Sequence, residues 1–89
     1  MEIKNIIRDD KQCSILAVTD SPESAVKCNN EILGAVMNEA GDLKDLKLLN
    51  NLAVGPNFAA SFEAPDPEEG RPADILNMVE DYLKNVVAV

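Results

Sequence analysis

Histidine and tryptophan are absent from the 89-residue sequence, which holds only three aromatic residues and two cysteines. Without histidine, the commonest general base and metal ligand is missing. Gly34, Gly41, Gly55 and Gly70 stand singly, so no glycine-rich loop is present to bind phosphate. We therefore expect no catalytic residue, no metal site and no cofactor, and we predict that the protein is not an enzyme.

Positive charge is also scarce, since eight basic residues stand against sixteen acidic ones, giving a net charge of −8. Such a surface repels nucleic-acid phosphates and anionic membranes, and three aromatic residues offer no stacking platform for single-stranded nucleic acid. The acidic excess is larger in residues 50–89, which hold seven acids and two bases. We therefore expect no direct nucleic-acid binding, and we expect a protein partner with a basic surface.

Long hydrophobic runs are lacking too. No apolar stretch approaches the roughly 18 residues that a membrane-spanning helix requires. The first residues, "MEIKNIIRDDKQ", are charged from the second position, unlike a signal peptide. We therefore expect no membrane partner and a cytoplasmic location.

The two cysteines, Cys13 and Cys28, have no C-x-x-C spacing and no histidine near them. They form neither a redox motif nor a zinc site. We predict that both thiols are reduced and buried.

The length of 89 residues, with 46% hydrophobic and 27% charged residues, predicts a single folded domain over residues 1–89. A chain this short buries only about two thirds of the surface that its unfolded form exposes, so its stability is small. A homodimer would bury further surface, and we include it among the expected partners.

Several segments have the pattern of β-strands. Two stretches rich in β-branched residues flank residues 9–12, which have the composition of a turn, and together they predict a hairpin. The nearly continuous apolar run at residues 14–19 predicts a strand that is central or covered on both faces. Strict alternation over residues 58–64 predicts a half-buried strand after a turn at residues 55–57. Residues 42–54 predict a helical turn or two, a strand, or both in succession.

Two further segments have the pattern of amphipathic helices. Asp20 or Ser21 can cap the first helix, Pro22 suits its first position, and Gly41 suits its end. Pro72 likewise suits the start of the second helix. The apolar faces comprise Ala25, Val26, Cys28, Ile32, Leu33, Val36, Met37 and Ala40 in the first helix, and Ile75, Leu76, Val79, Tyr82, Leu83 and Val86 in the second.

These elements predict an α+β fold of order ββαββα. It is a two-layer sandwich in which a mostly antiparallel sheet of four strands carries two helices on one face. The last residues, "VVAV", fit either a final helical turn or a fifth strand. In the second case the arrangement is ferredoxin-like, βαββαβ, with an extra N-terminal strand.

The stretch "EAPDPEEGRPAD", residues 63–74, is the main candidate for a partner contact because it combines five acids with three prolines. The prolines restrict the backbone and lower the entropy lost on binding. Its carboxylates cannot be buried unpaired, so we expect an exposed connection. The residues predicted to bind the partner are Asp66, Glu68, Glu69, Arg71 and Asp74.

Asn29 falls within the apolar face of the first helix. A buried amide needs hydrogen-bond partners, so Asn29 is either a satisfied polar group of the core or part of a ligand or subunit contact.

The sequence thus predicts a small acidic, non-enzymatic protein-interaction module, an inhibitor or regulator that binds a basic surface of a partner protein. The alternative is a small-molecule-sensing regulatory domain of ferredoxin-like type. Its ligand would lie at a subunit interface near Asn29 or the turn at residues 55–57.

Overall fold

A computed structural model describes residues 1–64 and 72–89, together with the backbone of Arg71. The elements in chain order are β1 (Ile3–Asp9), β2 (Ser14–Thr19), α1 (Pro22–Met37), β3 (Leu48–Val54), β4 (Asn57–Phe62), α2 (Arg71–Tyr82) and η2 (Leu83–Val87), a π-helical turn. The predicted order ββαββα and the α+β class are confirmed.

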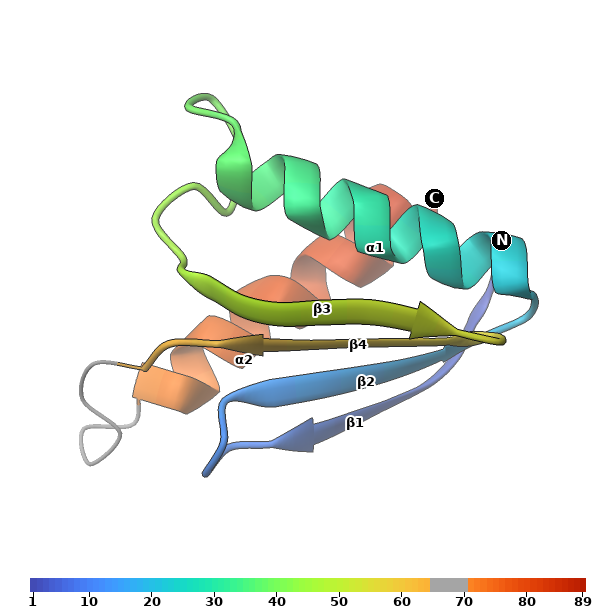
Figure 1. Ribbon diagram of the computed structural model, residues 1–89, viewed down its shortest axis with the longest axis horizontal. Helices are drawn as coiled ribbons and strands as arrows, with labels where there is room; N and C mark the ends of the chain where they lie inside the picture. The colour runs from blue at the N-terminus through green and yellow to red at the C-terminus, as the bar shows by residue number, and fades with distance from the viewer. Residues whose placement is uncertain (65–70) are drawn as a thin grey trace.

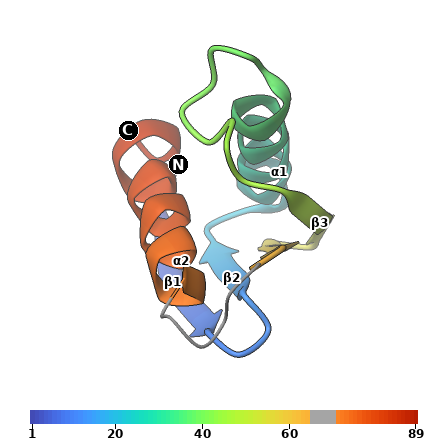
Figure 2. The ribbon, with the colours of Figure 1, turned by 90° about the vertical axis from the view of Figure 1, so that its left-hand side faces the viewer.

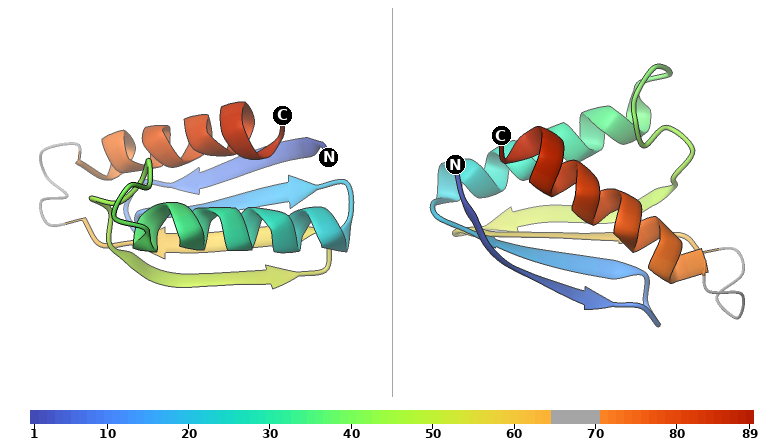
Figure 3. Two further views of the ribbon diagram at one scale, coloured as in Figure 1. Left: turned by 90° about the horizontal axis from the view of Figure 1, so that it is seen from above. Right: turned by 180° about the vertical axis from the view of Figure 1, so that it is seen from behind.

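The four strands form one antiparallel sheet in the order β1-β2-β4-β3. Both helices lie on the same side of this sheet, as Figures 1 and 2 show, and they run in roughly opposite directions along it (Figure 3). No described element covers the other side of the sheet. Within the described residues, no helix is long and apolar enough to cross a membrane.

The core lies between the helices and the covered face of the sheet. The predicted alternation in β4 is confirmed, since Phe58, Ala60 and Phe62 are buried. β2 lies centrally, as predicted, but only Ile15, Ala17 and Thr19 are buried, so just one of its faces is covered. Buried residues of the helices and of the connection before β3 complete the core: Ala25, Cys28, Ile32, Ala35, Leu43, Leu76, Val79, Leu83 and Val87.

The start of α1 agrees with its cap pattern. Ser21 is the N-cap, and its Oγ accepts a hydrogen bond from the backbone N–H of Ser24 at 3.2 Å. The Ser24 hydroxyl donates to Asp20 at 2.6 Å. Asp20 therefore supports the cap from outside the helix.

The predicted end of α1 at Gly41 is wrong, because the helix ends at Met37 and Asn38 has extended backbone angles. Met37 is 74% exposed and Ala40 is also exposed, so neither joins the core. Val26, at 49% exposed, lies at the margin of the apolar face. Leu33 is only half-buried. The core face of α1 is thus narrower than the sequence pattern predicts.

Gly41 has a different role from a helix stop. A Cβ at this position would overlap the backbone carbonyl oxygen of Ala35. The same oxygen accepts the N–H of Leu43 at 3.2 Å, which brings the chain back against the end of α1. Only glycine permits this close approach of two backbone segments.

The segment between α1 and β3 contains hydrogen-bonded turns rather than a helix. The N–H groups of Lys44 and Leu46 bond to carbonyls three residues earlier. β3 then begins at Leu48, two residues before the "NNLAV" stretch that predicts a strand. Leu43 is buried, whereas Leu49 is 60% exposed.

The C-terminal residues form a π-helical turn, so the predicted fifth strand and the ferredoxin-like alternative are wrong. The N–H of Ala88 bonds to the carbonyl of Leu83 at 2.9 Å, a span of five residues. This wider turn shifts the helical register by one position. Val87, four residues after Leu83, is buried, and the wider turn leaves Val86 50% exposed.

Candidate functional site

Two connections between elements, residues 10–13 and 38–47, lie at the same end of the molecule as the end of β4 and the start of α2, on the left in Figure 1. The first joins β1 to β2 and the second joins α1 to β3, while residues 63–70 join β4 to α2 in the sequence. The other end has only residues 20–21 and 55–56 between elements. Binding residues concentrate on connections held by a rigid scaffold, so the end with the longer connections is the candidate site.

The same three connections hold much of the acidic excess. They carry eight acids and three bases, a net charge of −5, against the single Asp20 in the two connections at the other end. We call the end formed by the described residues 10–13, 38–47, 63–64 and 72–74 the acidic end. Its field favours an approaching cation.

The acidic end contains a hollow of about 530 Å³. Three apolar side chains, Leu46, Ile75 and Met78, contribute to its wall, and three carboxylates lie beside them. Lys47 is the one base among the described lining residues, and its Nζ lies 3.2 Å from Glu63 Oε2. The pair is exposed and therefore weak. The lining residues described are Asp45, Leu46, Lys47, Glu63, Asp74, Ile75 and Met78.

This combination suits the side chain of a lysine or arginine. Such a side chain can lay its methylene stem on an apolar surface while its cation meets carboxylates. Two carboxylates, those of Asp45 and Asp74, have no described salt bridge to a basic side chain. The hollow therefore has the chemistry for a basic side chain from outside.

Of the residues predicted to bind a partner, Asp74 lies in the first turn of α2, is exposed, and lines this hollow. Asp66, Glu68 and Glu69 lie outside the described residues, and for Arg71 only the backbone is described. Asp45, Leu46 and Met78 also line the hollow but were not predicted as site residues from the sequence. Their contribution depends on the return of residues 42–47 beside α2, for which the sequence has no local signal.

Asn29 lies half-buried on α1, and its Oδ1 accepts a hydrogen bond from Asn51 Nδ2 of β3 at 2.7 Å. This bond provides a partner of the kind that a half-buried amide requires. A ligand or subunit contact at Asn29 stays a prediction.

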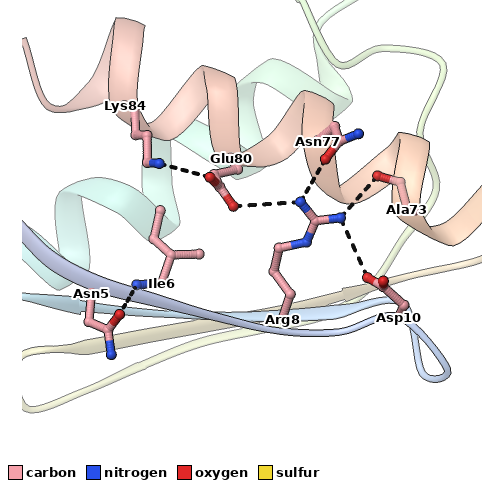
Figure 4. Close-up of polar contacts among 8 residues, drawn as sticks. All are labelled: Asn5, Ile6, Arg8, Asp10, Ala73, Asn77, Glu80 and Lys84. Atoms are coloured by element: carbon pink, nitrogen blue, oxygen red, sulfur yellow. Dashed lines mark hydrogen bonds and ion pairs between the residues drawn. The ribbon is translucent and has the colours of Figure 1, made fainter.

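A second polar cluster ties β1 to α2 through Arg8, which points to the helix layer (Figure 4). The guanidinium donates to Asn77 Oδ1 at 2.6 Å and to the carbonyl of Ala73 at 3.2 Å. It also lies 3.6 Å from Glu80 Oε1, while Lys84 Nζ donates to the other oxygen of Glu80 at 2.8 Å. Because Arg8 lies on β1 and its partners Asn77 and Glu80 lie on α2, this network holds α2 against the edge of the sheet.

Glu80 makes this cluster sensitive to pH. The hydrogen bond from Lys84, helped by the charges of Lys84 and Arg8, holds the pKa of its carboxyl below the ordinary 4.5. A carboxyl with a lowered pKa stabilises the fold fully above its ordinary pKa, and this contribution is lost as the pH falls through the folded value.

We therefore expect the Glu80→Gln variant to be less stable than the wild type at neutral pH, with a difference that shrinks as the pH falls below 4.5. Denaturant unfolding across that range measures the difference. A gap that stays constant down to the acid transition would show that the Glu80 charge contributes nothing.

Both cysteines are free and buried, as predicted. Burial raises the pKa of both thiols, and the nearby charge of Asp10 raises that of Cys13 further. Cys13 also has a φ of 50°, a left-handed conformation, and its carbonyl accepts the N–H of Phe62 at 2.9 Å. Thiols with raised pKa values are poor nucleophiles, so their environment is that of core residues.

Among the described residues, no group of three or more cysteine, aspartate or glutamate side chains could hold a metal ion.

Comparison with known proteins gives one informative similarity. No protein-family model matches the chain, and no solved structure matches it. The chain is 29% identical over 85 residues to carboxy-S-adenosyl-L-methionine synthase of Shewanella halifaxensis (strain HAW-EB4). The match covers 89% of this chain but 32% of that protein, so the chain spans about a third of its relative. Because the relative is named as an enzyme, the similarity gives no support to the prediction that this chain is not one.

Proposed function

We propose that this chain is a non-enzymatic protein-interaction module, an inhibitor or regulator whose acidic end binds a basic surface of a partner protein. The observation that carries the proposal is the hollow of the acidic end, where Asp45, Glu63 and Asp74 lie beside an apolar wall. A lysine or arginine of the partner enters this hollow. Further carboxylates of the same end attract the surrounding basic surface.

Such binding has a defined electrostatic signature. Attraction between an acidic and a basic surface mainly raises the association rate, and salt screens it over about 8–10 Å at ionic strengths of about 0.1–0.15 M. Affinity should therefore fall as salt rises.

A titration with a hexalysine peptide, followed by NMR of the ¹⁵N-labelled chain, locates the surface that attracts basic groups. We expect the backbone amides of Leu46, Ile75 and Met78 to shift most, and the shifts to weaken at high salt. The variant Asp45→Asn/Glu63→Gln/Asp74→Asn should bind the peptide several-fold more weakly.

The matched control is Glu2→Gln/Glu23→Gln/Asp81→Asn, which removes three exposed acids elsewhere and leaves the same net charge. If the two variants lose affinity equally, only the total charge matters, and the acidic end has no special part in binding.

A second candidate function follows from the similarity to carboxy-S-adenosyl-L-methionine synthase over 89% of the chain. In this case the chain would bind carboxy-S-adenosyl-L-methionine, the compound in that enzyme's name. Calorimetric titration with this compound separates the two proposals. Saturable binding would favour the second, whereas the interaction module should give no binding heat.

A further inference from the structure

The side of the sheet turned away from the helices is an ordered surface with its own pattern. Strand register places its side chains in three rows that cross all four strands. We call this surface the open face. Its central row is entirely apolar and consists of Ile7, Leu16, Ala59 and Leu52.

The two flanking rows contain amides, hydroxyls and valines. One row consists of Asn5, Val18, Asn57 and Val54, and the other of Asp9, Ser14, Ser61 and Asn50. Asp9 is thus the one charged residue of the three rows, in a chain whose net charge is −8. The open face is the part of the sheet that a second acidic molecule can approach with the least repulsion.

The open face is also not flat. Ile7 and Leu52, at the two ends of the central row, are 52% and 43% exposed. Between them lies a hollow of about 290 Å³, whose lining includes Leu16, Ala59 and Ser61. Protruding aliphatic side chains and a hollow thus lie on one surface, as a self-complementary interface requires.

We infer that the open face binds the open face of a second copy of this chain, forming a two-fold dimer of packed sheets. The two-fold axis brings each central row against its counterpart, with Ile7 or Leu52 of one copy opposite the hollow of the other. The polar rows form the rim, where amides and hydroxyls can bond to each other or to water. This inference is independent of the proposed function, which uses the acidic end.

The area of the open face is small for a dimer contact. Four strands about 4.8 Å apart and three rows of side chains give a contact that buries on the order of 1,000 Å² in total. This area is at the low end for specific interfaces, so we expect a dissociation constant in the micromolar range.

Salt should change the affinity of the dimer in the direction opposite to its effect on partner binding. The two copies are both acidic, so their net interaction outside the open face is repulsive. Screening this repulsion should tighten the dimer as salt rises. The acidic end should, by contrast, bind a basic partner more weakly as salt rises. The failure of one proposal can therefore be told apart from the failure of the other.

The test is sedimentation equilibrium of the wild type and of Ile7→Lys over a wide concentration range. We expect a monomer–dimer equilibrium in the wild type and at least a tenfold larger dissociation constant in the variant, because the lysine charge would be buried without a partner against the apolar row of the other copy. The control is Val86→Lys, since Val86 is 50% exposed but lies in the helix layer. It should leave the equilibrium unchanged, and circular dichroism should show that both variants are folded.

Two results would overturn the inference. One is a wild-type chain that stays monomeric at millimolar concentration and high salt. The other is a dimer that Ile7→Lys leaves intact while Leu52→Lys disrupts it, which would place the contact at the β3 edge of the sheet and not across its face.

Discussion

Replacing Leu83 with alanine should lower the free energy of unfolding by about 2–5 kcal/mol, the usual cost of a large-to-small change in a core. Leu83 is fully buried at the start of η2 and belongs to the cluster that includes Leu76 and Val79. Truncation would leave a cavity between the helices and the sheet. Urea unfolding followed by circular dichroism measures the loss.

The matched control is Val86→Ala, which removes a comparable apolar side chain three residues later. Because the π-helical turn leaves Val86 half-exposed, its loss should cost about 0.5 kcal/mol or less. A loss below about 0.5 kcal/mol for Leu83→Ala itself would place that face of the helix in solvent. Equal losses for the two variants would instead indicate that Val86 is as buried as Leu83.

Replacing Gly41 with alanine should destabilise the protein by about 1–3 kcal/mol, the cost of forcing extra atoms into a packed site. The new methyl group would overlap the backbone carbonyl of Ala35 and lie 3.0 Å from the carbonyl oxygen of Asn38. Backbone atoms cannot rotate away as a side chain can. The connection that places Leu43 in the core would have to shift.

Gly34→Ala provides the control within the same part of the chain. Gly34 lies inside α1, and a Cβ there meets nothing within 4 Å. This change should stabilise the protein by about 0.5–1 kcal/mol, because alanine favours the helix. Thermal unfolding of both variants shows the signs directly, and stabilisation by both would mean that residues 38–43 do not approach α1 closely.

The element order could be predicted from the sequence because local signals agree with the final fold. Ser21 and Pro22 mark the start of α1, and the alternation around Phe58 marks β4 and its buried face. Turn composition at residues 9–12 separates β1 from β2, where Asp9 Oδ1 accepts the N–H groups of Lys11 and Gln12. Each signal acts within a few residues.

The details that could not be predicted depend on contacts between distant residues or on small changes in backbone geometry. The helical pattern of α1 continues past Met37, but the chain turns back there so that Leu43 can enter the core. At the C-terminus one wider turn follows Leu83 and leaves Val86 half-exposed. A periodicity of 100° per residue contains no signal for either event.

The candidate site was predictable only in part. Acids and prolines mark residues 63–74 in the sequence, and of these Glu63 and Asp74 line the hollow. Asp45 and Leu46 come from another connection, and the tertiary fold brings them beside α2. The sequence did not predict that one face of the sheet is uncovered, because the run of apolar residues in β2 is typical of a strand covered on both faces.

The central claim, that the acidic end binds a basic partner protein, is tested most directly by association kinetics. The wild-type chain is used to capture its partner from the organism that produces it, and the association rate of the purified pair is measured at low and high salt. The variants are Asp45→Asn/Glu63→Gln/Asp74→Asn, the triple serine variant at Asp66, Glu68 and Glu69, and the control Glu2→Gln/Glu23→Gln/Asp81→Asn. We predict that the first two slow association at low salt by about tenfold, that the control changes it much less, and that high salt removes the differences. Equal rates for all four proteins at both salt concentrations would contradict the claim.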